Sequence, residues 1–239
     1  MRKSGRIVAS VLDHLSSRVK PGTTTWDLEL VALDHLNTKY PQAIPAFKGY
    51  MGYPTALCVS INEEVVHGIP SKTRVIKEGD LVSIDFGVFY EGYVGDSAIS
   101  VVAGHGSKEV LDLLKVTRDS LYEGIKQAKV GNYLHDISFA VQDYVESKGY
   151  SVVRELVGHG IGKSMHEAPQ VPNFGEKGTG IIIKPGLTIA VEPMVTAGSY
   201  EVEFLNDGWT AVTSDGSLAA HFEHSLAITS QGTIILTEL

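Results

Sequence analysis

Residues 81–102 read LVSIDFGVFYEGYVGDSAISVV, with two apolar runs on either side of Tyr90-Glu91-Gly92. The tripeptide is a turn signal and the runs have the composition of strands, so the stretch predicts a β-hairpin. One acid stands in each strand, Asp85 in the first and Asp96 in the second. If the turn is centred between Tyr90 and Glu91, the carboxylates face each other with Cβ atoms about 5 Å apart, where like charges are destabilising. A divalent cation between them would reverse that effect, whereas two solvent-facing acids would need none.

The segment that leads into this hairpin is repeated later in the chain. Ile76-Lys77-Glu78-Gly79 leads to Asp85 and Ile183-Lys184-Pro185-Gly186 leads to Glu192, and each acid lies eight residues after the lysine. Three more echoes occur in the same order: Val19-Lys20-Pro21-Gly22 with Lys129-Val130-Gly131, His67-Gly68-Ile69 with His159-Gly160-Ile161, and Asp96-Ser97-Ala98-Ile99 with Glu223-His224-Ser225-Leu226. Four ordered echoes predict one duplicated catalytic domain over 1–239, with related halves of roughly 1–105 and 106–239.

Hydrophobic periodicity and breaker residues predict the secondary structure of both halves. The helices are expected at 4–19, 24–38, 107–128 and 133–148. The strands are expected at 55–61, 81–90, 93–102, 151–156, 187–195, 200–205, 209–213 and 222–229. Because each half carries helices followed by strands, we expect an α+β fold with an antiparallel sheet.

The overall composition is that of a globular protein with no nucleic-acid or membrane partner. Of the 239 residues, 43% are hydrophobic and 20% are charged, which suits one compact core. A formal net charge of −8 argues against nucleic acid or an anionic membrane as the main partner. Cys58 is the single cysteine and permits no internal disulfide, and no stretch of about 20 apolar residues is present. We therefore expect a cytoplasmic protein.

Five residues of metal-ligand type stand out from the repeat and its surroundings: Asp85, Asp96, His159, Glu192 and Glu223. Acids in apolar strands carry a desolvation cost unless cations neutralise them. One imidazole and four carboxylates suit two divalent ions, Co, Mn, Fe or Zn, better than a sulfur-liganded structural zinc. Such a pair activates water at neutral pH and polarises a carbonyl, which predicts a hydrolase. No nucleophile elbow, phosphate loop or Cys-x-x-Cys motif competes with this interpretation.

Five motifs together resemble the type I methionine aminopeptidases of short bacterial form. They are Asn62–Pro70, Gly158–Gly162, His166–Pro169, Glu192–Met194 and Phe222–His224, and the resemblance covers essentially the whole chain. It implies the pita-bread fold, in which two pseudo-symmetric halves around a central antiparallel sheet cup a dinuclear metal centre. The implied reaction is hydrolytic removal of the initiator methionine from nascent polypeptides whose second residue is small.

The same resemblance implies individual roles for the site residues. Asp85 and Asp96 would each bind metal through both oxygens, Asp96 and Glu223 would bridge, and His159 and Glu192 would complete the ligand shells. His67 would contact the substrate near the scissile amide, and His166 would stabilise the developing oxyanion. Glu192 would also shuttle a proton from water to the leaving amine. The simpler interpretation of His67 and His166 is two ordinary loop histidines.

Six residues match the methionine pocket of that family: Phe47, Tyr50, Tyr53, Cys58, Met165 and Trp209. The alternative for each is ordinary core packing. Met165 departs from the family pattern, because an aromatic residue is often found there. The histidines outside the motifs are expected to be exposed residues without a role: His14, His35, His105, His135 and His221. His224 should point to the sheet face opposite Glu223, because strand side chains alternate.

Two other functions stay open at this stage. A proline-specific aminopeptidase or dipeptidase of the same fold would share all five ligands, although such enzymes usually carry an additional N-terminal domain. A non-catalytic peptide-binding module is the second alternative, but such modules lose metal ligands. We expect a monomer, with the ribosome open as a partner beside the nascent chain.

Overall fold

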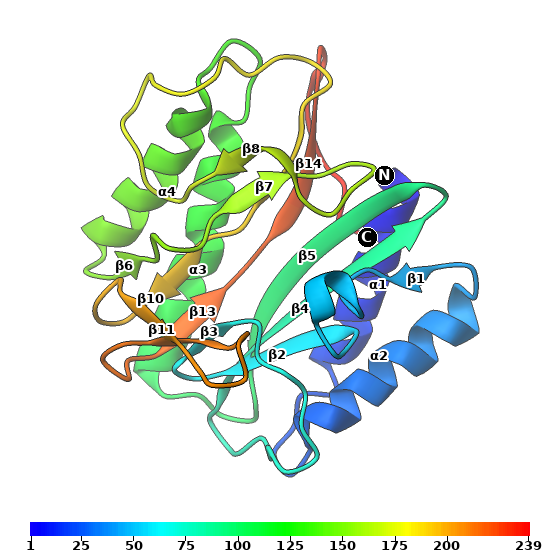
Figure 1. Ribbon diagram of the computed structural model, residues 1–239. Coiled ribbons are helices and arrows are strands. Elements are labelled where there is room, and N and C mark those ends of the chain that lie inside the picture. Colours follow the sequence, from blue (N-terminus) through cyan, green and yellow to red (C-terminus); the bar gives the residue numbers. More distant parts are fainter.

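The computed structural model describes residues 1–239 and contains two helix pairs, each followed by strands (Figure 1). The first part holds α1 (Arg2–Ser16), α2 (Thr25–Lys39), β1 (Ile44–Pro45), the 3-10 turn η1 (Tyr50–Gly52), β2 (Leu57–Ile61), β3 (Glu64–Val66), β4 (Leu81–Tyr90) and β5 (Tyr93–Val102). The second part holds α3 (Lys108–Gln127), α4 (Leu134–Ser147), β6 (Ser151–Val152), β7 (Gly158–Gly160), β8 (Glu167–Val171), β9 (Thr188–Val191), β10 (Met194–Thr196), β11 (Val202–Phe204), β12 (Ala211–Thr213), β13 (Ala219–His221), β14 (His224–Thr229) and β15 (Gly232–Ile235).

All strand pairs are antiparallel, as expected, and they form four sheets. Their strand orders are β1-β4-β2 with β5 paired to β4, β13-β10-β6, β11-β12-β3, and β15-β14-β9-β7-β8. The two parts of the chain meet where β5 approaches the segment before β14. There the Glu223 N–H donates to Ala98 O at 2.9 Å, and Ser97 Oγ donates to Glu223 O at 2.5 Å. This contact brings the two acid-bearing regions together.

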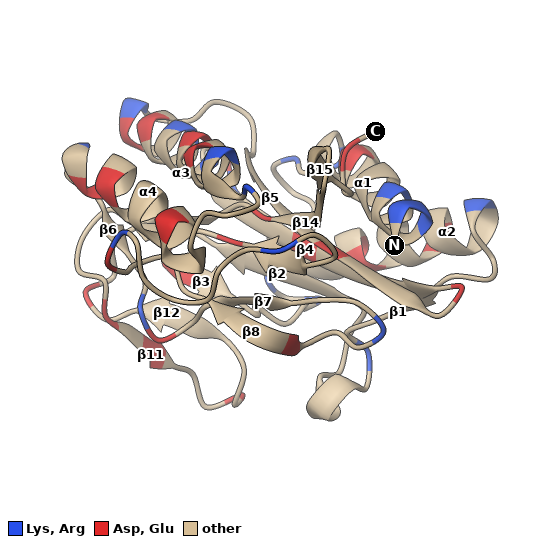
Figure 2. Cartoon of the chain, turned by 90° about the horizontal axis from the view of Figure 1, so that it is seen from above, with Lys and Arg blue, Asp and Glu red and all other residues tan.

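The four helices lie on one side of the sheets and leave the other side uncovered (Figure 2). Apolar residues of α1, including Val8, Leu12 and Leu15, are buried in one cluster with Ile84 and Phe86 of β4. A second cluster packs Leu121 and Ile137 of the other helix pair against strands β9 and β14. The helix-covered side is therefore the hydrophobic core, and the opposite side is free to form a site.

The second helix of each pair, α2 or α4, begins with the same local structure. The Thr24 N–H donates to Asp27 Oδ2 at 2.8 Å, and the Tyr133 N–H donates to Asp136 Oδ2 at 2.8 Å. Each acid accepts a hydrogen bond from a backbone N–H that has no partner within the helix, and its negative charge is stabilised by the positive end of the helix dipole. The preceding loops also match, since Gly22 N–H donates to Ile76 O and Gly131 N–H to Ile183 O. The repeat seen in the sequence thus recurs as equivalent contacts.

The expected helices are present, with ends shifted by up to three residues, and the strands differ more. Strands 81–90 and 93–102 coincide with β4 and β5. The expected strand 187–195 is instead two strands, because Pro193 lacks the N–H that a ladder requires. The expected strand 151–156 forms a ladder over its first two residues only. Strands β1, β3, β7, β8, β13 and β15 were not predicted, since most are too short for a period-2 pattern.

The register of the β4–β5 hairpin corrects one expectation. Glu91 and Gly92 have φ values of 49° and 83°, so the turn is of type I′ and is centred between them, one residue later than predicted. Asp85 is consequently opposite Ala98, and Asp96 is opposite Gly87. The two acids share a face as diagonal neighbours and are not directly opposed.

Candidate metal and substrate site

All five predicted ligands line one cavity of about 250 Å³. Asp85 and Asp96 come from the central strands β4 and β5. His159 is the middle residue of β7. Glu192 immediately follows β9, and Glu223 immediately precedes β14. The sheet thus converts residues from distant parts of the chain into one cluster.

The ligand atoms converge at distances that suit bound cations. Asp96, His159 and Glu223 each offer an atom, and these atoms lie within 4.8 Å of one another. His159 Nε2 is 3.9 Å from Asp96 Oδ2 and 3.6 Å from Glu192 Oε1. Asp85 and Asp96 lie on the same face of the β4–β5 hairpin as diagonal neighbours.

Burial opposes the charged form of all four carboxylates. It raises the pKa of Asp96 to about 7. It also raises the pKa of Asp85, Glu192 and Glu223 well above the usual range, and repulsion from neighbouring acids adds to these three shifts. The buried oxygens Asp85 Oδ1, Asp96 Oδ1 and Glu223 Oε1 have no hydrogen-bond partner. Because buried polar atoms are normally paired, these three oxygens fit cation ligands.

The orientation of His159 supports the same conclusion. Its Nδ1 donates to the Gly160 carbonyl at 2.9 Å, since a carbonyl oxygen can only accept. Nε2 is then left unprotonated and faces the acids, as in a metal-bound imidazole whose other nitrogen is held by the backbone. Burial lowers the pKa of His159 to about 4, which keeps the ring neutral. The residues present therefore fit divalent ions.

The two proposed catalytic histidines also line this cavity. His67 has a left-handed backbone with φ of 60°, which is uncommon for a non-glycine residue and typical of strained functional sites. His166 lies beside the ligand His159, with ring centroids 4.2 Å apart. Burial lowers the pKa of both His67, to about 4, and His166.

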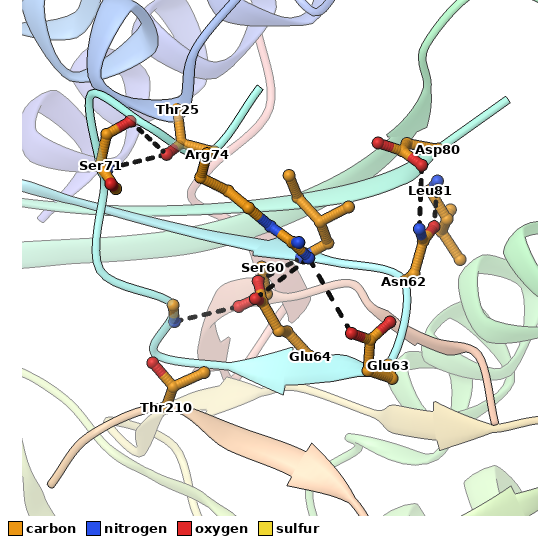
Figure 3. A network of polar contacts seen from close by, with 12 residues as sticks. Thr25, Ser60, Asn62, Glu63, Glu64, Ser71, Arg74, Asp80, Leu81 and Thr210 are labelled. Carbon is orange, nitrogen blue, oxygen red and sulfur yellow. Dashed lines mark hydrogen bonds and ion pairs between the residues drawn. The ribbon is translucent and has the colours of Figure 1, made fainter. Parts of the chain in front are cut away.

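A polar network around β3 holds the loop that follows this strand and carries His67; Figure 3 shows Ser60, Glu64 and Arg74 of this network. The Gly68 N–H donates to Ser60 Oγ at 3.1 Å, which fixes the residue after His67 to β2. Glu64 accepts the Ile61 N–H at 2.8 Å and pairs with Arg74 at 3.2 Å. This network ties β3 and its following loop to the neighbouring strands, so the strained backbone of His67 is maintained.

The six residues predicted for the methionine pocket line the same cavity: Phe47, Tyr50, Tyr53, Cys58, Met165 and Trp209. Tyr53 is buried, and its hydroxyl reaches the carbonyls of Leu57 and Gly68 at 3.2 and 3.1 Å. The rings of Trp209 and Tyr53 pack edge-on, with their centroids 5.1 Å apart. Burial raises the pKa of the Cys58 thiol, so it is uncharged and suits an apolar pocket.

Sequence reasoning missed five further lining residues: Met51, Val66, Leu156, Val157 and Met194. They are apolar, so their residue types did not distinguish them from core residues. Val66 and Met194 had a usable signal, since they lie within the motifs Asn62–Pro70 and Glu192–Met194.

The expectation that His221 and His35 are exposed is wrong. His221 is 1% exposed, its Nε2 has no hydrogen bond and lies 3.7 Å from Glu192 Oε2, and burial lowers its pKa to about 3. Period-2 alternation from Glu223 would have placed it on the ligand side. His35 is buried between α1 and α2 beside Ser10 Oγ at 3.0 Å. His224 does not line the cavity and instead contacts Thr237 and Tyr122.

Comparison with known proteins places this geometry in context. Residues 1–230 match the sequence profile of metallopeptidase family M24. The methionine aminopeptidase of Clostridium acetobutylicum is 52% identical over 99% of this chain and 94% of its own length. The crystal structure of a methionine aminopeptidase from Thermotoga maritima is 47% identical, covers 100% of this chain and 95% of its own, and superimposes with a TM-score of 0.97.

A more distant neighbour shares the fold only. The Xaa-Pro dipeptidase from Bacillus anthracis is 22% identical, and its match covers 100% of this chain but 59% of its own, with a TM-score of 0.77.

Proposed function

We propose that this chain, which belongs to metallopeptidase family M24, is a metal-dependent methionine aminopeptidase. It would remove the N-terminal methionine from nascent polypeptides whose second residue is small. Its fold is the pita-bread fold, and we infer that two related halves form its single catalytic domain. The observation that carries the proposal is a cluster of unpaired buried carboxylates at an apolar cavity of about 250 Å³.

Asp85, Asp96, His159, Glu192 and Glu223 would hold two divalent ions, chosen from Mn, Fe, Co and Zn. Bound there, the ions would activate water at neutral pH and polarise the scissile carbonyl. The unpaired oxygens of Asp85, Asp96 and Glu223 support these ligand roles.

The other side chains would bind the substrate and move protons. Glu192 would take a proton from the attacking water and pass it to the leaving amine, the role of a general base and acid. His166 would donate a hydrogen bond to the developing oxyanion, and His67 would contact the scissile amide. Tyr53, Cys58 and Trp209 would enclose the thioether side chain, with Phe47, Tyr50 and Met165 nearby. The cavity volume of about 250 Å³ supports one unbranched side chain of this size.

The proline-specific alternative has less support. The dipeptidase neighbour is only 22% identical and indicates the fold, whereas methionine aminopeptidases match at about half identity over nearly the full chain.

No helix here combines the length and apolar character that a membrane span requires. A cytoplasmic location would follow from nascent chains as substrates, while the monomeric state and ribosome contact stay predictions.

The test is methionine release from Met-Ala-Ser after chelation and stepwise addition of Mn, Fe, Co or Zn. We expect His159→Ala to lose both metal and activity. His67→Ala and His166→Ala should keep their metal while turnover falls, for His166 by about 10² to 10³-fold, the usual loss for an oxyanion donor. Wild-type rates in Asp96→Asn, or preferential cleavage of Xaa-Pro peptides, would contradict the proposal.

A further inference from the structure

We propose that Tyr50 is a positioning residue that holds the His166 proton on Nε2, the nitrogen able to donate to the substrate oxyanion. The Tyr50 hydroxyl lies 2.8 Å from His166 Nδ1, and the two ring centroids are 5.3 Å apart. Neither the hydroxyl nor the His166 ring has another hydrogen bond within the protein. Because this role rests on the proposed function of His166, the test must separate the two.

The loop that carries Tyr50 is closed on itself. The Gly49 N–H donates to Tyr53 O at 2.8 Å, the Tyr50 N–H to Phe47 O at 2.9 Å, and the Tyr53 N–H to Tyr50 O at 2.9 Å. Three of its residues are left-handed, since φ is 84° at Gly49, 48° at Met51 and 91° at Gly52.

The left-handed Met51 is informative because it is 81% exposed, so no burial of its own side chain stabilises that conformation. A strained non-glycine residue persists only where its surroundings determine it. The closed turn therefore aims Tyr50 at His166.

The chemistry of the pair decides which group donates. A neutral imidazole carries one N–H and one bare nitrogen, so His166 can either accept from Tyr50 at Nδ1 or donate to it. A phenol O–H is more acidic than a neutral imidazole N–H, and an imidazole nitrogen is a better acceptor than a phenol oxygen. Tyr50 consequently donates, which places the ring proton on Nε2. The opposite arrangement would turn a lone pair toward the substrate carbonyl oxygen and repel it.

Tyr50 thus has a different role from a wall of the methionine pocket. A wall residue contributes contact area, so its removal would weaken substrate binding. A residue that sets the tautomer of His166 acts when charge develops on the oxyanion, so its removal lowers turnover. The hydroxyl and the ring can be tested separately, because Tyr50→Phe deletes only the hydroxyl.

The experiment compares Tyr50→Phe with wild type on Met-Ala-Ser. We expect kcat to fall about five-fold, the equivalent of one net hydrogen bond, with KM changed less than two-fold. In the His166→Ala background the same substitution should change kcat less than two-fold. Tyr133→Phe, at the start of α4, is the matched control and should leave kcat unchanged. A rise in KM at constant kcat would assign Tyr50 to the pocket wall and overturn the inference.

The second readout is independent of activity. In zinc-loaded protein with ¹⁵N-labelled histidine, His166 should show a protonated Nε2 and a bare Nδ1. Tyr50→Phe should show a mixture of the two tautomers. A wild-type proton on Nδ1, or an unchanged tautomer in Tyr50→Phe, would overturn the inference. If the wild-type protein released no methionine, the proposed function would fail, while this spectrum would still test the Tyr50–His166 hydrogen bond.

Discussion

Asp96 lies where the two parts of the chain meet. Its Oδ2 is 3.9 Å from His159 Nε2, and its Oδ1 is buried without a hydrogen bond. Burial raises its pKa to about 7, so the cation-free protein takes up a proton there that the unfolded chain would release. A bound cation replaces that proton. The stability of the cation-free protein should therefore depend on pH through this residue.

We expect the contribution of Asp96 to the free energy of unfolding of the chelated protein to fall as pH rises from about 4 to about 7, whereas buried histidines such as His159 and His221, whose pKa values are lowered, contribute in the opposite direction. The sign follows from linkage: the folded pKa of Asp96, about 7, is above its unfolded value, so its contribution is complete below the unfolded pKa and is lost through the folded pKa. Asp85, Glu192 and Glu223 act in the same direction. Urea unfolding in chelator should show that the slope of unfolding free energy against pH is more negative in wild type than in Asp96→Asn. The exposed Asp34→Asn is the control, and equal slopes in all three proteins would contradict the assignment.

At the scale of elements, α1 and β5 approach each other at backbone contact. A Cβ added at Gly95 would lie 2.7 Å from Gly5 N, and one added at Gly5 would lie 2.2 Å from Leu236 O. No side chain can occupy either position without moving the helix. Gly95 directly precedes Asp96, so the packing of α1 also sets the position of that ligand.

Gly95→Ala should therefore lower both stability and metal affinity. We expect a loss of about 1–3 kcal/mol in the free energy of unfolding, the usual cost of overpacking. Gly92→Ala is the matched control, because its Cβ would meet no atom and only the left-handed φ of 83° is strained. It should cost about 1–2 kcal/mol and leave metal affinity unchanged. Urea titration and calorimetric metal binding measure the two effects, and unchanged affinity in Gly95→Ala would refute the link to Asp96.

For the whole molecule, the cavity joins the two parts of the chain. Asp85 and Asp96 come from the first part, and His159, Glu192 and Glu223 come from the second. Ligands shared in this way make ion binding a property of the assembled fold, since neither part alone presents the full set. Binding should then stabilise the molecule as one unit.

Adding Mn to the chelated protein should raise the temperature of a single unfolding transition. At a free-ion concentration of 100 times Kd, the expected gain is about 2.7 kcal/mol. Asp96→Asn should lose most of this gain. Scanning calorimetry at neutral pH measures it, and two separate transitions or an unshifted midpoint would exclude an ion shared between the two parts.

The sequence by itself determined features that depend on local pattern and residue chemistry. The bounds of β4 and β5, the paired helices and the antiparallel α+β class follow from periodicity and turn residues. The proposed ligands were found because acids in apolar strands are chemically conspicuous, and all five line the cavity.

Only the tertiary structure decided what depends on contacts between distant residues. The one-residue difference in the hairpin register required the left-handed backbone of Glu91, a residue that seldom adopts it. The burial of His221 against Glu192 joins residues 29 positions apart, and the hydrogen bond between Tyr50 and His166 joins residues 116 positions apart. No local pattern encodes such pairs, because the packing of whole elements brings them together.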